Sequence, residues 1–385
     1  MLKKKIVYVV NSSAFFISHF LPLAKHNAQK GYEIFLVFGD STNNSSSELT
    51  GFTIHNYSMS RSGKNPFIEL VAVFKLIKIF KNIKPDLIHA FTIKPILHCG
   101  FINLMPFSFS PKSIIYSVTG LGSSYLDKSF MGKIIWFNVK LLYIFLFKPS
   151  NTHVLFENDD DIELFTKNDA LNKSKASIIN GAGVDTSKFI PKGNGASQSS
   201  HKIKVAMVSR LLIDKGVMDF IEAAKLLKAM NSNVEMLLVG DIDTGNISSV
   251  KLPVIKKLHN NEIINYLGFC DDISSLYKEI DIACLPSYQE GLPKSLIEAM
   301  SCGLPIIATD VPGCRQLVND GENGLLVNVR DPNDLANKIH SLTSNDRLVE
   351  EMGIKSRQLA IENFDLQIVL KQFDNVYNQQ LKAIL

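Results

Sequence analysis

The chain has 385 residues, more than one hydrophobic core usually supports, so we expect two domains of roughly 180 residues each. Hydrophobic residues make up 46% and charged residues 20% of the sequence, as in an ordinary globular protein. The five cysteines form no CxxC pair and no Cys/His cluster with metal spacing, and their odd number fits a disulfide framework badly. A reducing cytoplasm is the simpler interpretation.

The net charge of +4 conceals an asymmetry between the two halves. Residues 1–150 carry 17 basic and 6 acidic side chains, a balance of +11, whereas the remainder carries 24 basic and 31 acidic side chains, a balance of −7. A basic first half suggests an anionic partner such as a membrane surface, a phosphorylated lipid or nucleic acid. Because no nucleic-acid-binding motif is present and the second half is acidic, we expect no nucleic-acid partner.

The first half alternates short β-branched runs with amphipathic stretches. We predict buried strands at 5–10, 33–38, 86–91, 113–118 and 152–157, with helices between them, as in a parallel sheet covered on both faces. The apolar run near the N-terminus is only six residues long, so we interpret it as the first strand and not as a signal peptide. No apolar segment reaches about 18 residues without a charge, so no transmembrane helix is expected.

Two segments of this half could contact a membrane. The stretch 65–85 spaces lysines three apart, at Lys75, Lys78, Lys81 and Lys84, beside apolar residues. Such a helix could lie on an anionic bilayer, although a helix packed on the sheet with a solvated lysine face is the preferred interpretation. The stretch 133–148 is apolar nearly all round, which is typical of a buried helix, and its Trp and Tyr leave peripheral contact open.

The second half shows the same alternation of strands and helices, after a polar, glycine-containing linker at 188–203. Its strands are predicted at 204–210, 234–240, 263–268, 282–287, 305–310 and 324–328. The sequence therefore predicts an α/β protein with two Rossmann-like βα domains, 1–187 and 204–363, facing across a ligand-binding cleft, and a C-terminal helix at 364–385 that packs back toward the first domain.

One stretch of the second domain, "YQEGLPKSLIEAMSCGLP" (288–305), predicts a helix that begins after a strand. Pro293 suits the first helical position, and Gly303 with Pro305 ends the helix. The helix N-terminus would then lie at the carboxyl edge of the sheet, where open α/β sheets bind ligands. The helix dipole and free backbone amides would favour a phosphate there, and the amides are those of Gly291, Leu292, Lys294 and Ser295.

Two carboxylates bracket this helix N-terminus. Glu290 and Glu298 are eight residues apart, about 12 Å along a helix, which is too far for one acid/base pair. They could instead hold the two ends of an elongated ligand with an anionic middle, such as a nucleotide sugar, because carboxylates accept hydrogen bonds from vicinal hydroxyls. The alternative is structural: Glu290 caps the helix and Glu298 is a solvated surface residue. Arg210 and Lys215, after the strand at 204–210, could neutralise a diphosphate beside them.

The combination of "VSRLLIDKG", "EGLPKSLIEAMSCGLPIIATDVPG" and "NGLLV" strongly resembles the second domain of retaining glycosyltransferases with the GT-B fold and a Glu-seven-residues-Glu motif (family 4). The first domain, with "VNSSAFFISHFLPLAKHNAQKGYEI", "IHAFTIKP" and "VTGLGSSY", resembles the CapM/PglA-like branch that builds capsule, O-antigen and N-glycan precursors. The resemblance implies that Glu290 contacts the donor sugar and Glu298 the ribose, and that Arg210 and Lys215 contact the diphosphate. The backbone around Gly291, Leu292, Pro293, Lys294 and Ser295 would complete the donor site.

The resemblance also implies an acceptor side in the first domain. The residues concerned are Ser13, Phe15, Phe16, His19, Lys94, Thr119 and Gly120. Lys94 would meet the phosphate of the acceptor. Thr119 stands where many relatives have a His that contacts the donor sugar, so the resemblance does not supply that contact here.

The implied activity is the retaining transfer of a hexose or N-acetylhexosamine, from UDP-GalNAc or UDP-GlcNAc before other UDP-sugars, to a polyprenyl-diphosphate-linked saccharide. The enzyme would be cytoplasmic and peripheral on the inner face of the membrane, with the basic first domain on an anionic surface. No cofactor or metal is expected, because the acidic run 158–161 is better explained as a helix cap. The alternatives are a nucleotide-sugar epimerase on the same fold and a lipopolysaccharide-core glycosyltransferase.

Overall fold

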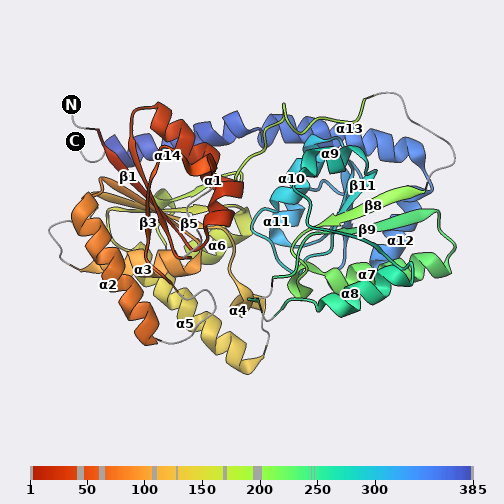
Figure 1. The fold of residues 1–385 in the computed structure, drawn as a ribbon, viewed down its shortest axis with the longest axis horizontal. Helices are drawn as coiled ribbons and strands as arrows, with labels where there is room; N and C mark the ends of the chain where they lie inside the picture. Colours follow the sequence, from red (N-terminus) through yellow and green to blue (C-terminus); the bar gives the residue numbers. More distant parts are fainter. Residues whose placement is uncertain are drawn as a thin grey trace. The chain divides into compact units, whose positions relative to one another are not determined.

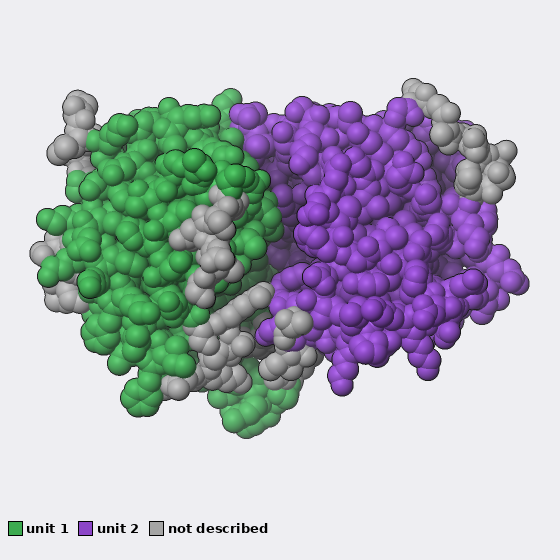
Figure 2. Space-filling view, viewed as in Figure 1, with its two compact units in different colours: residues 1–182, 370–385 green, residues 183–369 purple. Residues whose placement is uncertain are grey.

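The computed structural model describes residues 3–40, 47–59, 66–105, 111–126, 129–167, 171–193, 202–243, 245–246 and 248–382. The chain divides into two compact units, coloured separately in Figure 2. Unit 1 comprises Met1–Ala182 with Leu370–Leu385, and unit 2 comprises Gly183–Val369.

Unit 1 is built on a parallel seven-stranded sheet with the order β3-β2-β1-β4-β5-β6-β7. The strands are β1 (Lys5–Val10), β2 (Glu33–Phe38), β3 (Thr53–Asn56), β4 (Leu87–Phe91), β5 (Ser113–Val118), β6 (Thr152–Phe156) and β7 (Ala176–Ile178). The five predicted strands are confirmed, and β3 and β7 are additional. Both additional strands lie at the edges of the sheet and have no fully buried residue, so they lack the apolar run that marks a central strand.

Helices cover both faces of this sheet (Figure 1). They are α1 (Ser13–Gln29), α2 (Pro66–Ile83), α3 (Ile93–Leu104), α4 (Ser123–Leu126), α5 (Phe130–Phe147) and α6 (Asp159–Thr166), with short 3-10 turns at Ser47–Leu49 and Lys173–Lys175. Leu76 of α2, Ile96 of α3 and Phe147 of α5 belong to one hydrophobic core with strand residues such as Val7 and Ile88. This core holds α2, α3 and α5 on one face of the sheet.

The opposite face of the sheet receives α1 and the C-terminal helix α14 (Leu366–Lys382) through a buried polar network. His89 of β4 contacts the Tyr377 hydroxyl through Nδ1 at 2.6 Å and the Ser117 hydroxyl through Nε2 at 2.7 Å. The Tyr377 hydroxyl donates to the Tyr8 hydroxyl at 3.3 Å, which also accepts from Asn27 at 2.8 Å. Burial lowers the pKa of His89 well below its ordinary value, so the network is held by neutral groups.

Unit 2 is a parallel six-stranded sheet with the order β10-β9-β8-β11-β12-β13. The strands are β8 (Ile203–Val208), β9 (Val234–Val239), β10 (Asn265–Gly268), β11 (Ile282–Leu285), β12 (Ile306–Thr309) and β13 (Gly324–Val327). The helices are α7 (Val217–Ala229), α8 (Leu252–Asn260), α9 (Ile273–Lys278), α10 (Lys294–Ser301), α11 (Pro312–Arg315), α12 (Pro332–Thr343) and α13 (Asp346–Asn363), and a 3-10 turn spans Ile213–Lys215. Two Rossmann-like βα sheets are therefore present, as the sequence predicts.

The boundary between the units differs from the expected linker at 188–203, of which residues 194–201 lie outside the described residues. The first segment of unit 1 ends at Ala182, and the residues that follow belong to unit 2. The Val184 amide donates to Phe364 and its carbonyl accepts from Leu366. The Arg357 guanidinium donates to the carbonyls of Thr186 and Phe189, at 2.9 and 2.7 Å. These polar contacts, together with Val184 and Phe189 in the hydrophobic core of unit 2, explain why this loop segment belongs to the second unit.

The second crossing of the chain lies within α14, which begins in unit 2 and belongs to unit 1 from Leu370 onward. In unit 1 its Asp374 carboxylate pairs with Lys30 at 2.5 Å and with His26 at 3.0 Å, and its Gln380 accepts from the Ser113 hydroxyl at 2.7 Å. The last described turns of the chain are thus part of the first unit.

Tyr377→Phe tests the buried network beneath α14. Removing this hydroxyl leaves His89 Nδ1 without its partner in a site that water does not reach, so we expect the free energy of unfolding to fall by about 1–3 kcal/mol. Urea unfolding followed by circular dichroism measures the loss. Tyr32→Phe, which removes a partly exposed hydroxyl, serves as the control, and equal stability of the two variants would contradict a stabilising role of the network.

Candidate functional site in unit 2 and the matching edge of unit 1

The stretch "YQEGLP" lies in the loop between β11 and α10, at the carboxyl edge of the sheet of unit 2. Pro293 is the N-cap of α10, with φ −73° and ψ 107°, and not its first helical residue as the sequence suggested. Because Pro293 has an extended ψ, the helix begins one residue later than expected, at Lys294. The helix ends as predicted, with Gly303 following the C-cap in the left-handed conformation at φ +74°.

Glu290 is buried in this loop and pairs with Lys215. The Lys215 ammonium lies 2.7 Å from each carboxylate oxygen, and only 8% of the Glu290 side chain is exposed. Lys215 itself ends the 3-10 turn after β8. That turn is tied to the same loop, because the Asp214 carbonyl accepts from the Tyr288 amide at 2.9 Å and from the Ser287 hydroxyl at 3.1 Å. Two loops that are distant in sequence therefore present one charged pair.

Glu298 pairs with a different lysine, Lys294. The Lys294 ammonium lies 3.0 Å from a Glu298 carboxylate oxygen, one turn along α10, and both side chains are largely buried. The two glutamates are thus held by different lysines, with the N-terminus of α10 between them. This arrangement favours separate roles for the two carboxylates and argues against one shared acid/base pair.

Arg210 lies at the end of the neighbouring strand and pairs with Asp243. The Arg210 guanidinium Nη1 is 2.8 Å from a carboxylate oxygen of Asp243, whose side chain is 7% exposed, whereas Arg210 is half exposed. One face of the guanidinium is therefore oriented by a buried carboxylate. The rest of this planar group remains accessible to an anionic ligand.

The loops of the site approach one another so closely that two glycines are required. A Cβ atom on Gly313, at the start of α11, would lie 2.1 Å from the carbonyl oxygen of Gly291. A Cβ on Gly216, which has φ +77°, would lie 1.9 Å from the carbonyl oxygen of Pro286. Any side chain at either position would push away the loop that carries Glu290.

Three residues of this edge were not predicted from the sequence. The Arg330 guanidinium lies 4.6 Å from the centroid of the Tyr288 ring, and the Tyr288 hydroxyl bonds with Asp219. Burial raises the pKa of Asp219, and burial together with the Asp219 charge raises the pKa of Tyr288. These residues come from the loop after β13, the β11–α10 loop and the first turn of α7, so only the fold brings them together.

Gly313→Ala tests the close approach of the two loops. We expect the added methyl group to displace the Gly291 backbone and to lower the free energy of unfolding by about 1–3 kcal/mol, measured by urea unfolding. Gly193→Ala is the matched control, because a Cβ at Gly193 meets no atom within 4 Å. Unchanged stability of Gly313→Ala would show that the loops can separate without cost.

In unit 1, most of the predicted acceptor-side residues lie on loops and helix starts at the carboxyl edge of the sheet. The Ser13 amide and hydroxyl donate to the Asp40 carboxylate at 2.8 and 3.2 Å, which fixes the start of α1. The rings of Phe15 and His19 stack with their centroids 4.4 Å apart. Phe16 corrects the prediction: its ring is fully buried between β1, β2 and β4, because it lies on the inward face of α1.

Lys94 lies in the first turn of α3 and is held by α2. Its ammonium is 2.6 Å from Glu69 Oε1, while Glu69 Oε2 is 3.0 Å from Nε2 of the buried His98. Thr119 and Gly120 follow β5 and are partly exposed, and Gly120 has φ +140°. Because all strands of this sheet are parallel, the residues after β1, β4 and β5 share one edge.

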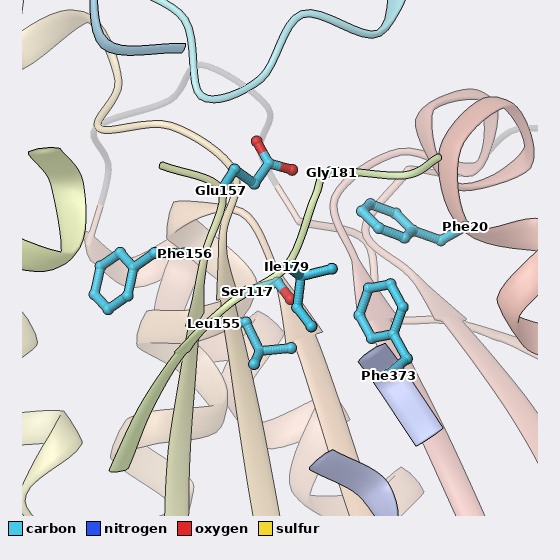
Figure 3. Close-up of a pocket in the computed structure, with 8 residues that line it drawn as sticks. All are labelled: Phe20, Ser117, Leu155, Phe156, Glu157, Ile179, Gly181 and Phe373. Atoms are coloured by element: carbon cyan, nitrogen blue, oxygen red, sulfur yellow. The ribbon is translucent and has the colours of Figure 1, made fainter. Parts of the chain in front are cut away.

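A small pocket opens at the same edge, and the sequence did not reveal it. It has room for about one water molecule and is lined by Phe20, Ser117, Leu155, Phe156, Glu157, Ile179, Gly181 and Phe373. Figure 3 shows the rings of Phe20 and Phe373 on one side and the Glu157 carboxylate at one end. Its walls come from helices α1 and α14 and from the ends of β5, β6 and β7, so no contiguous stretch encodes it.

The run NDDD (158–161) begins helix α6, but the cap is the side-chain amide of Asn158, and the three aspartates expected to cap the helix lie in its first turn. The Asn158 side chain accepts from the Asp161 amide at 2.8 Å and donates to the Asp161 carboxylate at 3.0 Å at the start of α6. Burial raises the pKa of Asp161 to about 6. Within the described ranges, no group of three or more His, Cys, Asp or Glu side chains could hold a metal ion.

Two protein-family models cover most of the chain. Residues 194–359 match the family described as "Glycosyl transferases group 1", and residues 5–148 match "Glycosyl transferase 4-like". The N,N'-diacetylbacillosaminyl-diphospho-undecaprenol alpha-1,3-N-acetylgalactosaminyltransferase of Campylobacter jejuni is 29% identical, with 96% of this chain and 97% of the relative covered. The UDP-Gal:alpha-D-GlcNAc-diphosphoundecaprenol alpha-1,3-galactosyltransferase of Escherichia coli is 25% identical, with 82% and 80% covered.

A solved structure shares the fold over nearly the full length. Sucrose-phosphate synthase from Thermosynechococcus elongatus superposes with a TM-score of 0.79 at 18% identity, covering 99% of this chain and all of that chain.

Proposed function

This chain belongs to the group 1 glycosyltransferases with the GT-B fold, and we propose that it moves a hexose or N-acetylhexosamine from a UDP-sugar to a polyprenyl-diphosphate-linked saccharide. UDP-GalNAc and UDP-GlcNAc are the favoured donors. The observation that carries the proposal is the pair of glutamate–lysine contacts, Lys215 with Glu290 and Lys294 with Glu298, on either side of the α10 N-terminus. This arrangement suits a ligand with hydroxyl groups at both ends and a diphosphate between them.

In the proposed complex each group has a distinct task. Glu290 accepts hydrogen bonds from the donor sugar, and Glu298 accepts them from the ribose diol. The diphosphate lies at the start of α10, where the amides around Leu292, Lys294 and Ser295 and the helix dipole favour an anion. Lys215 and the exposed side of the Arg210 guanidinium stabilise the negative charge that develops on the departing diphosphate.

The chemical step we propose retains the configuration of the donor sugar. The acceptor hydroxyl oxygen forms a bond to the anomeric carbon on the face from which the diphosphate departs, and the bond between that carbon and the diphosphate oxygen breaks. The proton of the hydroxyl passes to the departing diphosphate. In this scheme the fixed cations of the protein stabilise the leaving group, so no metal ion takes part.

The acceptor and the cellular setting are inferred from the relatives. The names of the Campylobacter and Escherichia relatives both specify saccharides linked to undecaprenyl diphosphate as acceptors. We propose the same acceptor class for this chain, in the assembly of bacterial O-antigen or capsule. The protein would act in the cytoplasm on the inner face of the membrane, with its basic first half toward the anionic surface, and Lys94 would meet the acceptor phosphate.

A donor screen tests the proposed reaction. The protein is incubated with each UDP-sugar and a synthetic polyprenyl-diphosphate monosaccharide, and the product is analysed by mass spectrometry and NMR. We expect one added sugar with the anomeric configuration of the donor. Conversion of a UDP-sugar into its epimer without acceptor would support the epimerase alternative instead, and an inverted product would refute retention.

Glu290→Gln and Lys215→Ala test the assigned roles of this ion pair. Each should reduce turnover by at least about 10²-fold, equivalent to roughly 2.7 kcal/mol of lost transition-state stabilisation, measured as initial rates with the donor identified above. Lys225→Ala is the control, since Lys225 is an exposed lysine on α7 that pairs with Glu222. Near-normal rates for the two site variants would show that the reaction takes place elsewhere.

A further inference from the structure

Two helices of unit 1 expose an unusual number of large apolar side chains. α2 and α5 lie on the same face of the sheet, with α3 between them (Figure 1). Their inner sides belong to the core, but their outer sides do not. The outer side, here called the apolar face, includes Phe67, Leu70 and Phe74 of α2, exposed by 77%, 53% and 60%, and Phe130, Ile134 and Phe137 of α5, exposed by 80%, 41% and 60%.

The exposure of α5 is not that of a core helix. By length and composition α5 could cross a membrane, and it is the one such helix among the described residues, but only 22% of it is buried. Tyr143, Leu146 and Phe147 at its C-terminal end belong to the hydrophobic core, so α5 is anchored to the unit there. Single exposed apolar residues are common on soluble proteins, as at Ile354 of α13, whereas a whole apolar helix side indicates an interaction surface.

The charges on these helices indicate which surface the apolar face contacts. α2 carries Lys75, Lys78 and Lys81, and α5 carries Lys133 and Lys140. The one acidic residue of the two helices is Glu69, and its carboxylate is paired with Lys94 and His98. Apolar side chains flanked by lysines match the interface of an anionic bilayer. The same lysines would repel one another if two copies of this face met.

The apolar face lies next to the expected acceptor side. Because α2 and α5 follow strands of a parallel sheet, their first turns lie at its carboxyl edge, together with the first turn of α3. The contact between Glu69 and Lys94, at 2.6 Å, joins the first turns of α2 and α3 directly. Phe67 lies two residues before Glu69, and Leu70 follows it directly. Any surface that receives the apolar face therefore lies close to Lys94.

We propose that α2 and α5 lie in the plane of an anionic bilayer with their apolar face inserted among the lipid headgroups and upper acyl chains. The lysines orient the protein on the bilayer, and the aromatic and aliphatic side chains hold it there. Insertion brings Lys94 to the depth of the lipid headgroups, where the diphosphate of a polyprenyl-linked acceptor lies; this last step rests on the function proposed above. Attachment in this mode depends on apolar contacts as well as on charge. The basic composition of the first half, taken alone, suggested attachment by charge.

The single tryptophan of the chain, Trp136, packs against Tyr125 and the core residue Phe165, so it does not lie on the apolar face. The probe for insertion is therefore the variant Phe137→Trp in a Trp136→Phe background, which places the one indole on the exposed side of α5. We expect the emission of this indole to shift to the blue when phosphatidylglycerol vesicles are added and to be quenched by lipids with brominated acyl chains. Co-sedimentation with the vesicles should persist at about 0.5 M NaCl, where exposed charges are screened within a few ångströms. Loss of all binding at this salt concentration, with no shift in the emission of the indole introduced at position 137, would overturn the proposal.

Paired variants separate the apolar contribution from the charged one. Phe74→Ser combined with Phe137→Ser should lower the partition coefficient at high salt about tenfold or more, because both rings leave the bilayer. Ile354→Ser, a similarly exposed apolar residue of unit 2, is the control and should bind as the wild type does. Lys75→Gln combined with Lys78→Gln should weaken binding at low salt and leave binding at high salt unchanged. Circular dichroism verifies that each variant is folded.

Two further measurements test whether the apolar face binds a bilayer or another partner. Sedimentation velocity that shows a lipid-free dimer, in which the indole introduced at position 137 is already shielded from a soluble quencher, would assign the apolar face to a second copy and overturn the proposal. On a vesicle-borne acceptor, the double Phe variant should transfer sugar more slowly than the wild type, with equal rates on a short water-soluble acceptor. A wild type that inserts but transfers to neither acceptor would refute the proposed function and leave the insertion established.

Discussion

The buried contact between Glu290 and Lys215 is the interaction on which the candidate site depends. A carboxylate with 8% exposure needs a cation, and Lys215 supplies it from a turn that is 75 residues away in sequence. Removing either partner would leave a charge stranded among the loops. The glycine contacts at Gly216 and Gly313 allow the backbone segments to come near enough for this pair to form. The charged centre and the close backbone packing are therefore parts of one arrangement.

The same parallel-sheet geometry serves different purposes in the two units. In unit 2 the carboxyl edge presents charged residues in pairs, each on a rigid turn or a helix start, which suits a small anionic ligand with defined ends. In unit 1 the corresponding edge has a stacked Phe15–His19 pair, a lysine oriented by Glu69 and a pocket beside Ser117. Its helices also expose apolar side chains. This composition suits a ligand that is polar at one end and attached to a lipid at the other.

Periodicity predicted most of the central strands because these are continuous apolar runs in parallel sheets. The edge strands β3 and β7 were missed because one side of each has no neighbour, so their residues need not be apolar. The start of α10 was placed one residue early, since the choice between N-cap and first turn depends on the ψ angle of Pro293. Phe16 was assigned to the acceptor side from the family resemblance, whereas the inward face of α1 buries it.

The amino-acid sequence by itself determined the two α/β units, the helix after "QEGLP" and the chemical character of Glu290, Glu298, Arg210 and Lys215, because these depend on local pattern and residue type. Only the tertiary structure decided which charges meet, since the partners Asp243, Lys215 and Arg330 come from separate loops. It also decided that the basic helices carry an exposed apolar face. Whether an apolar residue faces the core or the solvent depends on packing against the sheet, which no single helix encodes.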